Sequence, residues 1–141
     1  MTVIWNDSFL TGHKEIDDDH RTILLFINGV EYEIKKGIKA NKLRQSIDAL
    51  IIEIEEHFKR EERVMRELGA PLSSIEKLKD EHQILWREGN LILETLHSTA
   101  LEKNEKDRCL EILGKLEKWF VLRITEEDMI IKEILAKTNA P

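Results

Sequence analysis

Four long segments with the apolar periodicity of helices dominate this chain of 141 residues. They are predicted over residues 17–36, 42–67, 74–99 and 105–137. The breaks between them are each a few residues long and are rich in glycine, serine and asparagine, or contain Pro71. Because a short connection makes two helices antiparallel neighbours, this pattern predicts an all-α, up-down-up-down four-helix bundle.

The apolar residues of each segment recur at intervals of three and four, which places them on one face of a helix. We expect these residues to form the core: Ile23, Ile27, Val30 and Ile34; Ile47, Leu50, Ile51, Ile54 and Phe58; Ile75, Leu78, Ile84, Leu85, Leu91, Leu93 and Leu96; Leu110, Leu113, Leu116, Phe120, Ile124, Ile131 and Ile134. Residues 1–15 lack the periodicity but contain Trp5 and Phe9, so a non-helical arm laid along the bundle is predicted there. Residues 1–141 are interpreted as one domain.

The composition argues against several classes of function. Acidic residues exceed basic ones by 28 to 22, and this net charge of −6 disfavours a nucleic-acid partner. No membrane span or secretion signal is expected, because no run approaches about 18 apolar residues. The single cysteine, Cys109, excludes an internal disulfide and is expected on an exposed stretch of helix. A cytoplasmic location is therefore predicted.

Five residues with metal-binding side chains lie towards one end of a predicted helix. His20 and His82 are near the starts of the first and third helices, and His57, Glu61 and Asp128 are late in the second and fourth. In an up-down-up-down bundle these positions lie at one level. His57 and Glu61 are four residues apart, so their side chains share one helix face. A lone histidine is more often a structural residue, but three at one level favour a metal site, since imidazole and carboxylate suit Fe²⁺ or Zn²⁺.

The chain also resembles the hemerythrin family, in particular its small bacterial members. The residues that carry the resemblance occur in order along nearly the whole chain: Trp5; Gly12, Glu15, Ile16, Asp17 and His20; Asn28; His57, Phe58, Glu61, Glu62 and Met65; Pro71; Glu81 and His82; Trp119, Phe120, Ile124 and Asp128. The resemblance implies a bundle that holds two non-heme irons, bridged by a glutamate and an aspartate, with five histidine ligands and reversible O₂ binding. It implies that His20, His57, Glu61, His82 and Asp128 are metal ligands.

Two ligand positions implied by the resemblance are changed in this chain. Leu78 replaces the first histidine of an HxxEH motif, and Arg123 replaces a histidine five residues before Asp128. Both changes fall on the iron to which the resemblance assigns three imidazoles, of which only His82 is retained. The other iron keeps His20 and His57. We therefore expect one iron per chain in preference to two.

A metal-free site is also open as an alternative. A guanidinium is always charged, so Arg123 beside a dication would be costly, whereas it could pair with Glu61 or Asp128 in place of a metal. The bundle would then be an interaction or structural module. With a metal bound, we expect a protein that binds or senses O₂ or a similar small molecule and is not an enzyme. Weak oxidase activity or iron storage is a third interpretation.

Overall fold

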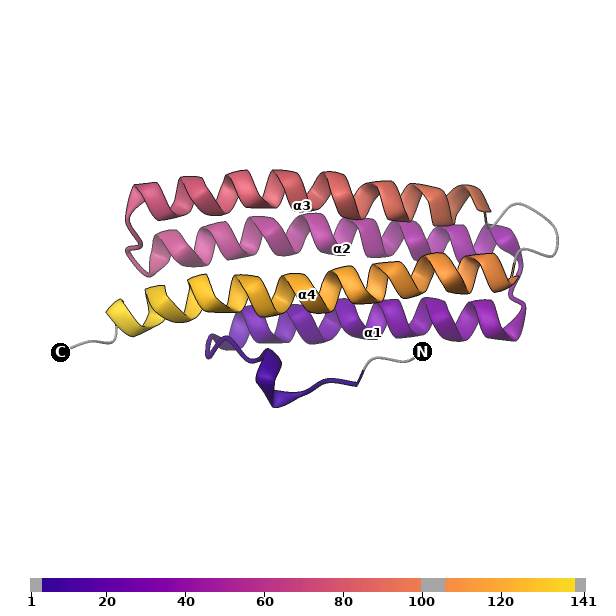
Figure 1. Cartoon of the computed structure of the whole chain (residues 1–141), viewed down its shortest axis with the longest axis horizontal. Coiled ribbons are helices and arrows are strands. Elements are labelled where there is room, and N and C mark those ends of the chain that lie inside the picture. The colour runs from indigo at the N-terminus through magenta and orange to yellow at the C-terminus, as the bar shows by residue number, and fades with distance from the viewer. Residues whose placement is uncertain (1–3, 100–105, 139–141) are drawn as a thin grey trace.

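The computed structural model of the chain describes residues 4–99 and 106–138, apart from the side chains of residues 126–130. Four helices follow the short 3₁₀ helix η1 (Asp7–Phe9): α1 (Lys14–Lys36), α2 (Ala40–Glu67), α3 (Leu72–Thr99) and α4 (Lys106–Thr138). The described part contains no strand. Successive helices run in opposite directions side by side (Figure 1). The predicted all-α, antiparallel four-helix bundle is confirmed.

The helices close around a shared interior. Each contacts the next along the chain, and α1 also contacts α4. As Figure 1 shows, α1 and α3 begin at the end of the bundle where α2 and α4 finish. This arrangement brings four of the candidate ligands, His20, His57, Glu61 and His82, to one level, as their order in the sequence predicted.

The residues at the helix ends explain where the helices begin and stop. Gly37 stops α1 with a φ of 72°, a conformation that favours glycine, and its N–H donates to the carbonyl oxygens of Glu33 and Ile34. The first three helices end where predicted but begin two or three residues earlier, at positions 14, 40 and 72. The start of α3 is explained by Pro71, whose fixed φ suits a helix start and whose carbonyl accepts from the N–H groups of Ser74 and Ile75.

The N-terminal arm contains one helical turn that the sequence did not predict. The side chain of Asn6 accepts a hydrogen bond from the N–H of Ser8 at 2.9 Å, which stabilises the start of η1. The turn presents Phe9 to the main apolar cluster, and η1 packs on α4. The described part of the arm therefore lies along the bundle, as predicted.

Two apolar clusters fill the interior. The larger one includes Phe9, Ile34 and Ile124. The smaller one, called the end cluster, consists of Ile16, Val64, Met65, Ile75, Leu78, Ile131 and Ile134. No helix in the described ranges is both long and apolar enough to cross a membrane.

Three predictions about burial are wrong. Ile84 and Leu91 are 55% and 66% exposed, because these residues, seven apart, share the outer face of α3. Leu78 and Leu85, also seven apart, occupy its inner face. Cys109, expected on an exposed stretch, is buried in the larger cluster.

Candidate metal centre

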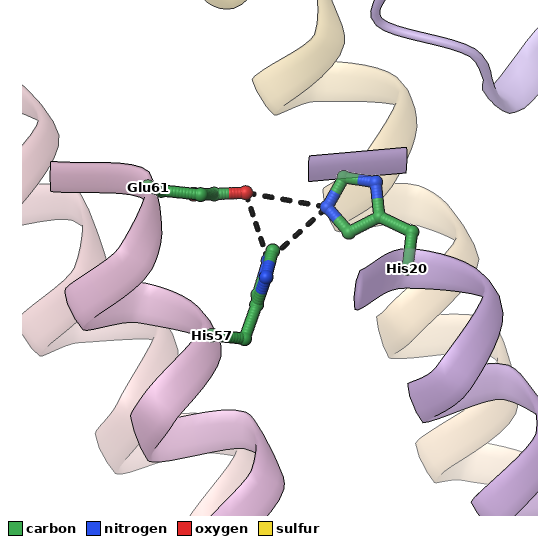
Figure 2. A group of neighbouring side chains, drawn as sticks. All are labelled: His20, His57 and Glu61. Carbon is green, nitrogen blue, oxygen red and sulfur yellow. Dashed lines mark hydrogen bonds and ion pairs between the residues drawn. The ribbon is translucent and has the colours of Figure 1, made fainter. Parts of the chain in front are cut away.

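His20, His57 and Glu61 converge in the interior of the bundle (Figure 2). His20 comes from α1, and the other two come from one face of α2. Nε2 of His20 lies 3.1 Å from Nε2 of His57 and 3.2 Å from Oε1 of Glu61. Nε2 of His57 lies 2.8 Å from the same oxygen. These three side chains, at most 3% exposed, form a closed triangle of potential ligand atoms, called the triangle below.

His82, on α3, contacts the other side of the same carboxylate. Its Nε2 is 2.8 Å from Oε2 of Glu61, and its ring stacks on Phe58 with the centroids 4.4 Å apart. Glu61 thus faces two imidazoles with one oxygen and a third imidazole with the other. Four of the five predicted ligand residues therefore come together. Asp128 belongs to the part of α4 whose side chains lie outside the described residues, so its role stays a prediction.

The buried carboxylate of Glu61 is stabilised by the groups around it. Burial would raise the pKa of this carboxyl, but the neighbouring His57 and hydrogen bonds from all three imidazoles hold it well below its ordinary value. An unprotonated Nε2 is an acceptor, and it would repel a carboxylate oxygen at these distances. Nδ1 of His20 is also buried and has no hydrogen-bond partner among the described residues. The triangle therefore needs either protons shared among its members or a metal ion.

The separations within the triangle, 3.1, 3.2 and 2.8 Å, are hydrogen-bond distances and are also short enough for the three atoms to bind one metal ion. Two histidines and one carboxylate on one face, with the other positions open, are the ligand set of many Fe²⁺ sites.

A comparison with protein families identifies the domain that contains these residues. The family model of the hemerythrin HHE cation-binding domain matches residues 11–135, a span that includes every predicted ligand. The chain belongs to the hemerythrin family. No curated protein and no solved structure matches it. Within this hemerythrin domain, His20, His57 and Glu61 are the described residues best placed to hold the cation that the family description names.

The first departure from the hemerythrin ligand pattern leaves an apolar side chain at the site. Leu78 is 1% exposed and packs in the end cluster, whose members also include Val64 and Met65. A leucine has no lone pair to offer, and the space around it is occupied by hydrocarbon. The part of the bundle that would hold a three-imidazole metal is therefore apolar on the side of Leu78.

At the second departure, Arg123 pairs with a residue outside the triangle. Its Nη2 donates to Oε2 of Glu88, on α3, at 3.0 Å. The sequence offered Glu61 or Asp128 as its partner, and within the described residues no ion pair joins it to Glu61. The physical reason is that both oxygens of Glu61 already face imidazoles. Pairing of Arg123 with Asp128 lies outside the described side chains.

A small cavity adjoins the triangle in this hemerythrin. It offers about 20 Å³ of space to the centre of a water-sized molecule, enough for one such molecule. Among the described residues, it is lined by the polar or charged side chains of His20, His57 and Arg123. The other lining residues are largely apolar: Ile23, Ile54, Phe58, Leu85, Trp119, Phe120 and Ile124. A ligand in this cavity would lie beside both imidazoles of the triangle.

The sequence analysis missed Asp19, which contacts a predicted ligand. Its Oδ2 lies 3.1 Å from Nδ1 of His57 and accepts a hydrogen bond from Nε of Arg60 at 2.7 Å. Burial would raise the pKa of Asp19, but the hydrogen bonds with His57 and Arg60 outweigh burial and lower it. Its place directly before His20 was a usable signal. The two aspartates that precede it, Asp17 and Asp18, hid that signal.

Proposed function

We propose that this hemerythrin-family protein binds one iron ion per chain and uses it to bind or sense O₂ or a similarly small molecule. The triangle of His20, His57 and Glu61 carries the proposal, because its three ligand atoms are buried and spaced like neighbours around one metal. Asp128 is proposed as a further carboxylate ligand. His82 is assigned to the second oxygen of Glu61, at the edge of the site.

A single metal is supported by what surrounds His82. A second ion beside it would lack the two imidazoles that Leu78 and Arg123 replace, and Leu78 belongs to the apolar end cluster. A dication with one imidazole and shared carboxylates is poorly held compared with one that has two imidazoles. The two-histidine half of the site is therefore the half proposed to be loaded.

Binding of a small molecule is supported by the cavity beside His20 and His57. Ferrous iron supplies affinity for O₂ and an electron to share with it. The chain's own residues hold the ion with imidazoles, balance its charge with Glu61, and surround the ligand space with apolar side chains that exclude bulk water. This cavity has space for one water-sized molecule and no room for an organic substrate, and we propose a binding role and not an enzyme.

The alternative function is that of a metal-free interaction module. For either function we propose a location in the reducing cytoplasm. That alternative drew its support from a pairing of Arg123 with Glu61 or Asp128, and the described ion pair of Arg123 is to Glu88. Without a guanidinium beside Glu61, the charge of this carboxylate would have to be balanced by protons on its imidazole neighbours. A metal-free site thus differs from a loaded one in a measurable way.

The proposed small-molecule function can be tested by filling the cavity. Ile124 is 2% exposed and lines the cavity, so Ile124→Phe should block it, whereas Ile84→Phe changes a residue that is 55% exposed. We expect the anaerobically iron-loaded protein and the Ile84→Phe control to change their ultraviolet-visible absorption on exposure to O₂. Ile124→Phe should keep its iron and lose most of that change. An iron-loaded wild-type protein that does not respond to O₂ would exclude O₂ as the ligand.

A further inference from the structure

Both ring nitrogens of His57 are contacted by consecutive residues of α1. Oδ2 of Asp19 lies 3.1 Å from Nδ1, and Nε2 of His20 lies 3.1 Å from Nε2. Successive residues of a helix point about 100° apart, so the imidazole from α2 fits between these two side chains. One turn of α1 therefore fixes the orientation of a ligand that belongs to another helix.

The contact with Asp19 determines which nitrogen of His57 can bind a metal. A carboxylate only accepts hydrogen bonds, so Nδ1 must carry a proton to bond with it. In a neutral imidazole the lone pair is then on Nε2, the atom that lies in the triangle. Without this contact, the ring could carry its proton on Nε2 and present no lone pair to a metal.

Arg60 holds Asp19 in place. Its Nε donates to Oδ2 of Asp19 at 2.7 Å, while its Nη2 donates to Oε1 of Glu53 at 2.8 Å. The side chain of Asp19 is 13% exposed, and that of Arg60 is 31% exposed. Two carboxylates hold the guanidinium of Arg60, and a guanidinium and an imidazole hold the carboxylate of Asp19. Both side chains therefore have little freedom to reorient.

We propose that Asp19 is the positioning residue for His57 in the metal site, with Arg60 as its anchor. The inference rests on the proposed function, because it assigns Asp19 a role only if the triangle binds metal. Removing a partner that orients a metal-bound imidazole weakens metal affinity by roughly 10-fold to 100-fold. Asp19→Ala should fall in this range. Asp19→Asn should lose less, because an amide oxygen still accepts the bond from Nδ1.

The test is the Fe²⁺ affinity of the full chain, measured anaerobically by competition with a chromophoric chelator. The matched control is Asp18→Ala, which removes the adjacent carboxylate; that side chain is 47% exposed and pairs with Lys14 and Arg21. Circular dichroism establishes that each variant is folded. If Asp19→Ala does not fold, Asp19→Asn and Arg60→Gln decide, and both should bind Fe²⁺ more weakly than the control.

The possible outcomes separate this inference from the proposed function. A graded loss, with Asp19→Ala weaker than Asp19→Asn and the Asp18→Ala control unchanged, supports the role of Asp19. Wild-type protein that binds Fe²⁺ while the folded Asp19 variants bind within twofold of it overturns the role and leaves the metal site intact. Wild-type protein that binds no Fe²⁺ overturns the proposed function, and the inference with it.

Discussion

Arg123 on α4 pairs with Glu88 on α3, with 3.0 Å between Nη2 and Oε2, and the indole N–H of Trp119 donates to the same oxygen at 3.2 Å. This pair links two helices at the bundle surface, where Glu88 is 43% exposed. The sequence offered Glu61 or Asp128 as the partner of this guanidinium in a metal-free site. Its described ion pair instead lies outside the triangle, which leaves the charge of Glu61 to its imidazole neighbours.

Removing the ion pair between Arg123 and Glu88 should cost little stability. Glu88→Gln is expected to lower the free energy of unfolding by less than about 1 kcal/mol, because ion pairs of this exposure contribute little. Urea denaturation of the metal-free protein measures this change, and Arg123→Met shows whether the guanidinium contributes more than this pair. A loss of about 3 to 5 kcal/mol would instead indicate that the guanidinium balances a buried charge.

Restoring both missing imidazoles should create a second metal position. The Leu78→His and Arg123→His double variant is expected to raise the iron content from about one towards two per chain, since it supplies two more nitrogen ligands near His82. The metal-free double variant should be less stable than wild type by roughly 2 to 4 kcal/mol, because a polar ring replaces a leucine that is 1% exposed. Elemental analysis and urea denaturation measure the two effects.

An unchanged iron content in a folded double variant would contradict this prediction. The matched control is Ile84→His with Arg123→His, which adds two imidazoles but places one of them on the exposed face of α3. This control should not gain iron. A gain in the control as well would mean that added histidines bind metal regardless of position.

Three adjacent aspartates show what the sequence could and could not predict. Asp17 accepts hydrogen bonds from the backbone and hydroxyl of Thr11 at 2.7 and 2.8 Å. Asp18 pairs with Lys14 in solvent, and Asp19 reaches His57. The sequence presents them as one acidic run, because their roles depend on the rotation of α1 about its axis. That rotation is set by packing between helices.

The predictable parts of the site are those that depend on spacing within one helix or on topology. His57 and Glu61 share a face because they are four residues apart, and His20 and His82 join them because the helices alternate in direction. The partner of Arg123 was not predictable in this way. It depends on the relative positions of α3 and α4, which no spacing within either helix reveals.

The far end of the bundle should make stability depend on pH. Glu117 and Glu31 are 5% and 2% exposed, and Lys35 pairs with Glu31 at 2.8 Å. Burial, together with a hydrogen bond to Glu31, raises the pKa of Glu117 to about 7. In the unfolded chain this group titrates near 4.3. Between about pH 4.5 and 7 the folded state thus holds a proton that the unfolded state has lost, so stability from Glu117 falls as pH rises.

Glu117→Gln should remove this dependence, since an amide cannot ionise. The metal-free variant is expected to match wild type near pH 5 and to exceed it at pH 8 by on the order of 1 to 3 kcal/mol. The pKa of Glu31 is lowered to about 2, so its own contribution is lost only below about pH 4.5 and does not enter this window. Urea denaturation at the two pH values gives the difference, and an equal or lower stability of the variant at pH 8 would refute the prediction.

The central claim is that the triangle holds one metal ion, and the iron content per chain tests it most directly. Wild-type protein and Glu61→Gln are reconstituted anaerobically with Fe²⁺, freed of excess metal and analysed for iron and protein. We predict about one iron per chain in the wild type and a clear loss in Glu61→Gln, which removes the anionic ligand shared by the imidazoles. Iron at background level in the folded wild-type protein would contradict the claim.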